Sequence, residues 1–151
     1  METEAIQDKW PEFATYCWGC GKNNIEGLQI KSYWDGDECV CNWQPKEQYL
    51  AFPGFLNGGI IASLIDCHSI NTACAAAYGS HGRETGTEPI LAYLTGSLYV
   101  EYLRPTPVEK PVVLKAKVKE FKPKKIVVTS KLLSRGEECA RGEVVAVKIE
   151  V

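Results

Sequence analysis

The sequence predicts an α+β fold in which one long central helix is wrapped by a curved antiparallel sheet of five to six strands. Residues 60–78 are apolar on nearly every face, which is typical of a helix buried in a core rather than lying on a surface. Stretches with strand-like composition lie on both sides of it, two before and four after. A single helix that is apolar all round needs a sheet curved around it to bury its faces.

Short elements are expected before the helix. We expect a short amphipathic helix in residues 4–14 and a turn-rich loop in 17–27. The two strands of a hairpin follow in 28–34 and 38–43, and a second loop in 44–56. Pro11 interrupts the amphipathic helix, because proline removes a backbone donor. Asp35-Gly36-Asp37 lies between two stretches that alternate in places, which indicates a hairpin.

Strands dominate the chain after the helix. A polar loop is expected in residues 79–89. Four strands are expected after it, in residues 90–103, 112–121, 125–134 and 139–151. Their connections are short, which makes these strands neighbours and mostly antiparallel. The chain contains no repeat, linker or low-complexity tract, so residues 1–151 are predicted to form a single domain.

Charge and composition argue against several classes of protein. A net charge of -2 at pH 7 disfavours a nucleic-acid binder that depends on phosphate contacts. The most apolar stretch contains Asp66, His68, Ser69 and Asn71, which disfavours a membrane span. The acidic first residues lack a signal-peptide core, so we expect a cytoplasmic protein whose 7 cysteines are reduced.

The start of the central helix has the features of an anion site. Asn57 is a good N-cap residue, and Gly58 and Gly59 leave the first amides without side-chain shielding. These amides have no partner within the helix, and the helix dipole favours an anion or a developing oxyanion beside them. The alternative is that the glycines only permit close packing. Asp66 is the one acid in the apolar run, so it is either paired or present for chemistry.

Four segments of the chain together resemble the motifs of one known family. Asn57-Gly58-Gly59 through Asp66 resembles the signature His-Gly-Gly-x-x-x-x-x-x-Asp, with the acid at the same spacing, of the hotdog-fold acyl-CoA thioesterases of the phenylacetate-pathway type. The other similar segments, in order along residues 17–150, are Cys17-Trp18-Gly19-Cys20-Gly21 with Asn24 and Gly27-Leu28, Pro53-Gly54-Phe55-Leu56, and Tyr102-Leu103-Arg104-Pro105.

The resemblance implies a role for each candidate site residue. The helix acid, Asp66, acts as general base or nucleophile, and an amide of Gly58 or Gly59 polarises the thioester carbonyl. Thr95 falls at the position of a hydroxyl that orients water; the alternative is an ordinary strand threonine. Asn57 replaces the family histidine, either to orient the substrate or only to cap the helix. Some relatives carry a polar residue where this chain has Ala51.

Helix geometry predicts a shared site. Gly59 and Asp66 lie on one helix face but are displaced by about 10.5 Å along the axis, too far to act on one carbonyl. Two such helices packed antiparallel about a two-fold axis would bring each Asp66 to the other chain's glycines. We therefore expect a homodimer, which can assemble further into a homotetramer.

Coenzyme A is expected as part of the substrate, with no separate cofactor. Its three phosphate groups call for basic residues near the mouth of the site. The candidates at strand ends and turns are Arg104, Lys122, Lys124, Lys125 and Arg135. Each of them taken singly is equally well explained as a solvated surface charge.

No metal site is expected. Cys17-x-x-Cys20 supplies only two ligands, whereas structural zinc takes about four, and Cys67 is read as a core residue. His68 is two residues from Asp66 and does not face it, so it is read as a satisfied buried polar group, whereas His81 lies in a polar loop.

The sequence thus favours an acyl-CoA thioesterase that hydrolyses a small or medium acyl-CoA. The departures at Asn57 and Ala51 favour an alternative, a non-catalytic hotdog protein that binds acyl-CoA or another apolar ligand. A hotdog dehydratase or hydratase is a third possibility, but it needs a catalytic histidine that the chain does not place well.

Overall fold

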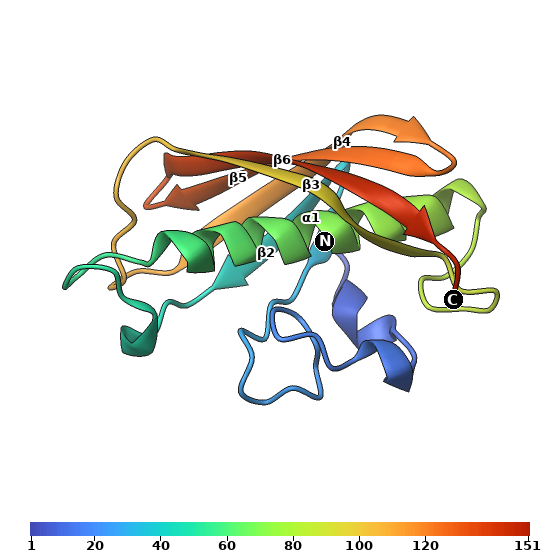
Figure 1. The fold of residues 1–151 in the computed structure, drawn as a ribbon, viewed down its shortest axis with the longest axis horizontal. Helices are drawn as coiled ribbons and strands as arrows, with labels where there is room; N and C mark the ends of the chain where they lie inside the picture. The colour runs from blue at the N-terminus through green and yellow to red at the C-terminus, as the bar shows by residue number, and fades with distance from the viewer.

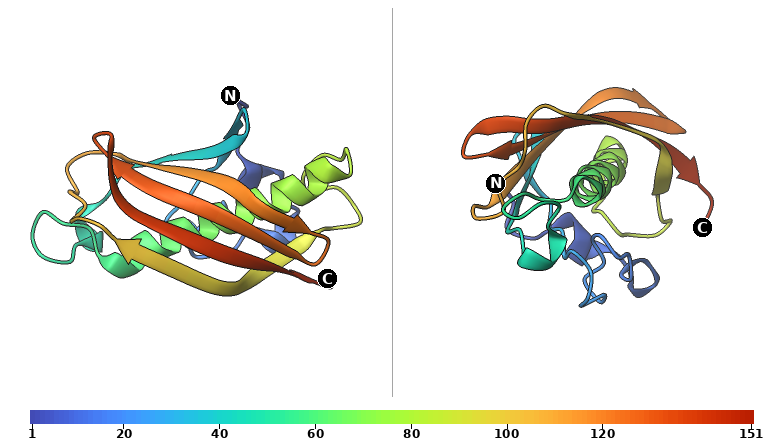
Figure 2. Two further views of the ribbon diagram at one scale, coloured as in Figure 1. Left: turned by 90° about the horizontal axis from the view of Figure 1, so that it is seen from above. Right: turned by 60° about the vertical axis from the view of Figure 1, so that its left-hand side comes forward.

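A single long helix lies along the concave face of a six-stranded antiparallel sheet (Figure 1). The computed structural model describes residues 1–151. The helix is α1 (Gly58–Ser80), and the sheet has the order β1-β2-β4-β5-β6-β3. The strands are β1 (Tyr33–Asp35), β2 (Glu38–Trp43), β3 (Ala92–Tyr102), β4 (Val112–Lys122), β5 (Lys125–Ser134) and β6 (Glu137–Ile149). Seen end-on, the sheet curves over the helix (Figure 2), as predicted.

Two expected elements are corrected. The expected strand at 28–34 is reduced to Tyr33–Asp35, because Leu28 and Ile30 pack into the core outside any ladder. The expected helix at 4–14 is two short 3₁₀ helices, Ile6–Lys9 and Glu12–Ala14, separated at Pro11.

The expected order of neighbouring strands holds for β4, β5 and β6 but not for β3. β3 pairs with β6, not with the next strand in sequence, and forms one edge of the sheet. The chain therefore crosses the sheet between Tyr102 and Val112 before it returns to pair with β2.

The core lies between α1 and the sheet. Ile61, Leu64 and Ile65 are buried from the helix against Leu114 and Leu132 of the sheet, within one continuous cluster. α1 is long and apolar enough to cross a membrane, but 61% of its most apolar 18-residue stretch is buried inside the fold. Its composition is thus explained by the core that it forms.

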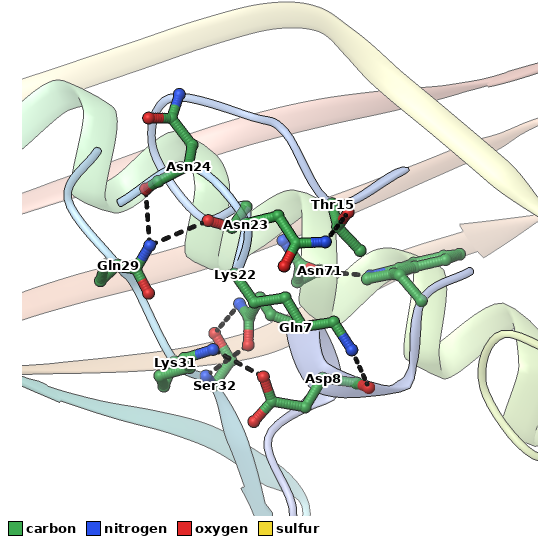
Figure 3. Close-up of polar contacts among 12 residues, drawn as sticks. Gln7, Asp8, Thr15, Lys22, Asn23, Asn24, Gln29, Lys31, Ser32 and Asn71 are labelled. Atoms are coloured by element: carbon green, nitrogen blue, oxygen red, sulfur yellow. Dashed lines mark hydrogen bonds and ion pairs between the residues drawn. The ribbon is translucent and has the colours of Figure 1, made fainter. Parts of the chain in front are cut away.

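The N-terminal segment covers the side of α1 that faces away from the sheet (Figure 2). Trp10 donates its indole N–H to Asn71 of the helix over 2.9 Å, and its ring meets Tyr78 edge-on. Polar contacts fasten the segment to itself, including Lys31 to Asp8 and Asn23 to Thr15 (Figure 3). The sequence did not predict this cover, because the contact that ties the segment to the helix, Trp10 to Asn71, joins residues 61 positions apart.

A buried polar chain joins this segment to the helix through His68. Gln7 donates to the Ser32 hydroxyl over 2.9 Å, and Ser32 lies 2.7 Å from His68 Nδ1. Nε2 lies 2.9 Å from the Cys39 carbonyl, which can only accept, so His68 carries its proton on Nε2 and accepts from Ser32 at Nδ1. His68 is therefore a satisfied buried group, as predicted. Burial lowers its pKa from 6.5 to about 4.

We expect this histidine to make folding sensitive to acid. Its pKa is lower in the folded state, so the unfolded chain binds the proton first and stability is lost as the pH falls below 6.5 toward 4. The expected loss in the free energy of unfolding between pH 7.5 and pH 5 is about 2 kcal/mol, measured by urea unfolding. His68→Gln should flatten this part of the profile, whereas the exposed His81→Gln should not. Equal pH dependence in wild type and His68→Gln would contradict the assignment.

Candidate active site

The structure brings together the acid and the hydroxyl that the sequence selected. Thr95 on β3 donates its hydroxyl to Asp66 Oδ1 over 2.7 Å. The register of β3 against β6 shifts between Thr95 and Ser97, a bulge that redirects the strand. A Cβ at Gly96 would lie 2.6 Å from a methyl group of Val147, so this position needs glycine. Thr95 is thus more than an ordinary strand threonine.

Asp66 is half-buried, and only one of its oxygens has a partner within the chain. Burial raises the pKa of its carboxyl group above 3.8, and the hydrogen bond from Thr95 opposes this shift. A carboxylate held in this way can accept a proton from a bound water.

The helix start differs from expectation in which amide is free. Asn57 caps the helix, and its side-chain oxygen accepts from the Gly59 amide over 2.7 Å and from the Ile60 amide over 3.3 Å. The Gly59 amide is therefore already paired and is not the free donor. The Gly58 amide makes no hydrogen bond within the chain. Gly58, not Gly59, is the donor available to an oxyanion.

Tyr102 is a site residue that the sequence did not reveal. Its hydroxyl donates to the Gly58 carbonyl over 2.6 Å, and a Cβ at Gly58 would lie 3.5 Å from its ring. Tyr102 therefore fixes the position of the glycine whose amide is free. It was recognised only within the motif Tyr102-Leu103-Arg104-Pro105, which gives no hint of this contact.

Asp66 and the helix start lie along one incompletely covered stripe of α1. Its partly or fully exposed residues are Gly59, Ala62, Ser63, Asp66, Cys67 and Ile70. The neighbouring edge strand β3 exposes 59% of Leu94 and 39% of Leu98. An exposed, apolar edge strand of this length is a surface that proteins normally cover.

An apolar cavity of about 370 Å³ adjoins Asp66. Ile70, Cys74, Tyr93 and Ile149 contribute to its apolar wall, and Asp66 and Thr95 also line it. The arrangement places one carboxylate and one hydroxyl beside a pocket that suits an apolar group.

The five basic candidates do not form one group, contrary to expectation. Lys122, Lys124 and Lys125 lie at the hairpin between β4 and β5. Arg104 lies just after the end of β3 and Arg135 just after the end of β5, at the end of the sheet away from that hairpin. Arg104 is paired with Glu137, and Arg135 with Glu109. Lys122 pairs with Glu120 at 3.1 Å, which leaves Lys124 and Lys125 without an acidic partner.

The cysteine pair of the N-terminal loop meets a third cysteine on the helix. The sulfur atoms of Cys17, Cys20 and Cys67 all lie within 4.8 Å of one another, and all seven cysteines are free. Cys67 packs against the core cluster, as expected, but its sulfur also lies 3.9 Å from that of Cys17, a contact that the sequence did not predict. Hydrogen bonds from the other two thiols lower the pKa of Cys17.

Comparisons with known proteins agree with the fold. No family profile matches the sequence. A thioesterase superfamily protein of known structure from Shewanella loihica is 40% identical, covers 80% of this chain and 91% of its own, and superposes with a TM-score of 0.66. The E. coli PaaI protein of the phenylacetic acid degradation operon is 17% identical, with a TM-score of 0.67 and coverage of 82% of this chain and 81% of its own.

A curated relative is the acyl-coenzyme A thioesterase THEM4 of Xenopus laevis, 28% identical over 112 residues. The match covers 74% of this chain but 45% of that protein, so the chain spans less than half the length of this relative. A protein from Streptococcus mutans with bound acetyl-CoA has the same fold, at 13% identity and a TM-score of 0.66 over 80% of this chain and 88% of its own.

Proposed function

Because this chain belongs to the thioesterase superfamily and has a hotdog fold, we propose that it hydrolyses the thioester of a small or medium acyl-CoA to the free acid and CoA. The observation that carries the proposal is the 2.7 Å hydrogen bond from Thr95 to Asp66 at the edge of an apolar cavity. Acyl-CoA thioesterase is the activity named for the curated relative, and acetyl-CoA is bound by a structural neighbour.

The residues divide the reaction between them. Asp66 removes a proton from water, or attacks the carbonyl itself, through the oxygen that Thr95 leaves free. Thr95 holds the carboxylate in place. The free amide of Gly58 stabilises the negative charge that develops on the thioester oxygen. When Asp66 acts as base, the tetrahedral intermediate collapses to the free acid, and the departing CoA thiolate takes up the proton that Asp66 received from water. When Asp66 attacks the carbonyl, loss of the CoA thiolate leaves a mixed anhydride on Asp66, which water then hydrolyses to the free acid.

The proposed site is shared by two chains. Gly58 and Asp66 are eight residues apart on one helix, about 12 Å along its axis, so they cannot serve one carbonyl. We propose a homodimer in which the exposed stripes of two α1 helices lie antiparallel and the two β3 edges pair. This arrangement would cover the apolar edge residues and bring each Asp66 to the Gly58 of the other chain.

Lys124 and Lys125 are the proposed contacts for CoA phosphate. They have no acidic partner, and their hairpin contacts the end of β6, since the Lys148 amide donates to the Lys124 carbonyl over 3.0 Å. Ile149, one residue further on, lines the cavity beside Asp66. Arg104 and Arg135 are poorer candidates, because each is already paired with a glutamate.

A panel of acyl-CoAs of increasing chain length tests the function. We expect hydrolysis of thioesters with small or medium acyl groups, and the free CoA thiol that is released measures the rate. Stoichiometric binding of acyl-CoA without any hydrolysis would instead support the non-catalytic alternative, with Asn57 and Ala51 as the residues to revert toward the family pattern.

A charge on the edge strand should dissociate the dimer. Leu98→Lys places a cation among apolar groups that the proposed interface buries, whereas Phe121→Lys changes a similarly exposed residue, 44% against 39%, at a hairpin end. We expect dimers for wild type and Phe121→Lys, and monomers for Leu98→Lys, by analytical ultracentrifugation at micromolar concentration. A monomeric wild type would refute the shared site.

A further inference from the structure

We propose that Cys17, Cys20 and Cys67 form a zinc-binding site that ties the N-terminal loop to α1. Their three sulfur atoms lie within 4.8 Å of one another. Three thiolates around one tetrahedral Zn²⁺, with Zn–S bonds of 2.3 Å, are separated by about 3.8 Å. The separation between the Cys17 and Cys67 sulfur atoms, 3.9 Å, already matches this value. Only small side-chain movements are needed to bind the ion.

The loop has the local geometry of a metal-binding turn. The amide of Gly21 donates to the Cys17 carbonyl over 2.8 Å and closes the turn. A Cβ at Gly21 would lie 2.4 Å from the Cys17 amide nitrogen, so the turn requires glycine there.

Gly19 links the loop to the third sulfur. A Cβ at this position would lie 2.3 Å from Cys67 Sγ, closer than any real contact. Because Gly19 has no side chain, the Cys67 sulfur can approach the loop. Glycine is therefore required at position 19 for contact with the helix, whereas at position 21 it is required for the turn.

Asn71 supplies the outer contact that metal-binding thiolates commonly have. Trp10 has only an N–H to give, so its 2.9 Å bond fixes Asn71 with the oxygen toward Trp10 and the NH₂ group toward sulfur. That NH₂ group lies 3.4 Å from Cys20 Sγ and 2.8 Å from the Cys67 carbonyl. A donor facing the sulfur stabilises a thiolate and orients it.

The fourth position is open. No further histidine, cysteine or carboxylate joins the group of three sulfurs, and Cys17 is exposed. Water would complete the tetrahedron on that side. Zn²⁺ is favoured over Mg²⁺ or Ca²⁺, because those ions take oxygen ligands. Cys17, Cys20 and Cys67 line the same cavity as Asp66, but zinc content and hydrolysis are measured separately, so the two proposals can fail independently.

Metal analysis of the purified protein tests the proposal. Wild-type protein prepared with reductant and without chelator should contain about one zinc per chain by inductively coupled plasma mass spectrometry. Cobalt(II) should replace it and give the visible absorption of a tetrahedral thiolate site. Cys67→Ala should lose the metal, whereas Cys74→Ala, a buried cysteine two turns further along the same helix, should retain it.

Affinity gives the second measurement. In competition with a chromophoric chelator, Cys67→Ala should bind zinc more than about 100-fold more weakly than wild type, beyond the effect of losing an outer contact. Cys17→Ala should do the same, and because Cys17 is exposed this variant should keep its fold. Equal affinity in wild type and both variants would overturn the site. A wild-type protein that takes up no zinc, or that carries a disulfide between these cysteines in its place, would also overturn it.

Discussion

Asp66→Asn is expected to lower kcat/KM for acyl-CoA by about 10²- to 10⁴-fold, the usual effect of losing a general base. The amide keeps the shape of the side chain and can still accept from Thr95, but it can neither take a proton from water nor attack the carbonyl. Folding should survive, because neutralising a partly desolvated carboxylate is neutral or stabilising. Steady-state kinetics and thermal unfolding of the same preparations measure both effects.

Two controls define this result. Asp37→Asn changes an exposed turn carboxylate and should leave the kinetics unchanged. Thr95→Ala should cost less than Asp66→Asn, because the carboxylate remains and only its orientation is lost. If Asp66→Asn hydrolyses acyl-CoA as fast as wild type, the assigned mechanism is wrong.

Gly58→Pro should give a second large loss, about 10²- to 10³-fold in kcat, by removing one oxyanion donor. Gly58 is the first helical residue, where proline is well tolerated because its missing N–H has no partner in the helix. Asn57 already has φ -63° and ψ 137°, the extended conformation required before a proline. The substitution therefore removes the proposed donor with little change to the helix.

Gly58→Ala is the matched control, because it keeps the N–H and adds a methyl group at an ordinary 3.5 Å from the Tyr102 ring. Its kcat should stay close to wild type. The two variants should show similar circular dichroism and thermal unfolding. Similar kcat values for the proline and alanine variants would exclude the Gly58 amide as the oxyanion donor.

The sequence predicted those parts of the fold that local pattern determines. β2 and β5 have the predicted bounds, and α1 extends the predicted helix by two residues at each end, because apolar periodicity and turns mark these elements directly. The place of β3 at the sheet edge could not be read locally, because short connections favour neighbouring strands and this chain crosses the sheet instead.

The candidate site was predictable in its acid and hydroxyl but not in its donor or its sulfur cluster. The free amide depends on which amide the Asn57 side chain occupies, and composition cannot distinguish Gly58 from Gly59. Cys17 and Cys67 are 50 residues apart, and Trp10 and Asn71 are 61 apart. Such pairings follow from the path of the N-terminal segment over the helix, which no short-range pattern encodes.

A hybrid dimer tests the shared site most directly. Asp66→Asn and Gly58→Pro chains with different affinity tags are expressed together, and the mixed dimer is purified through both tags. If each site takes Asp66 from one chain and Gly58 from the other, one site of the hybrid carries both defects and the other carries none. The hybrid should recover about half of the wild-type activity per dimer, whereas each parent remains impaired. A hybrid no more active than the two parents would contradict the account.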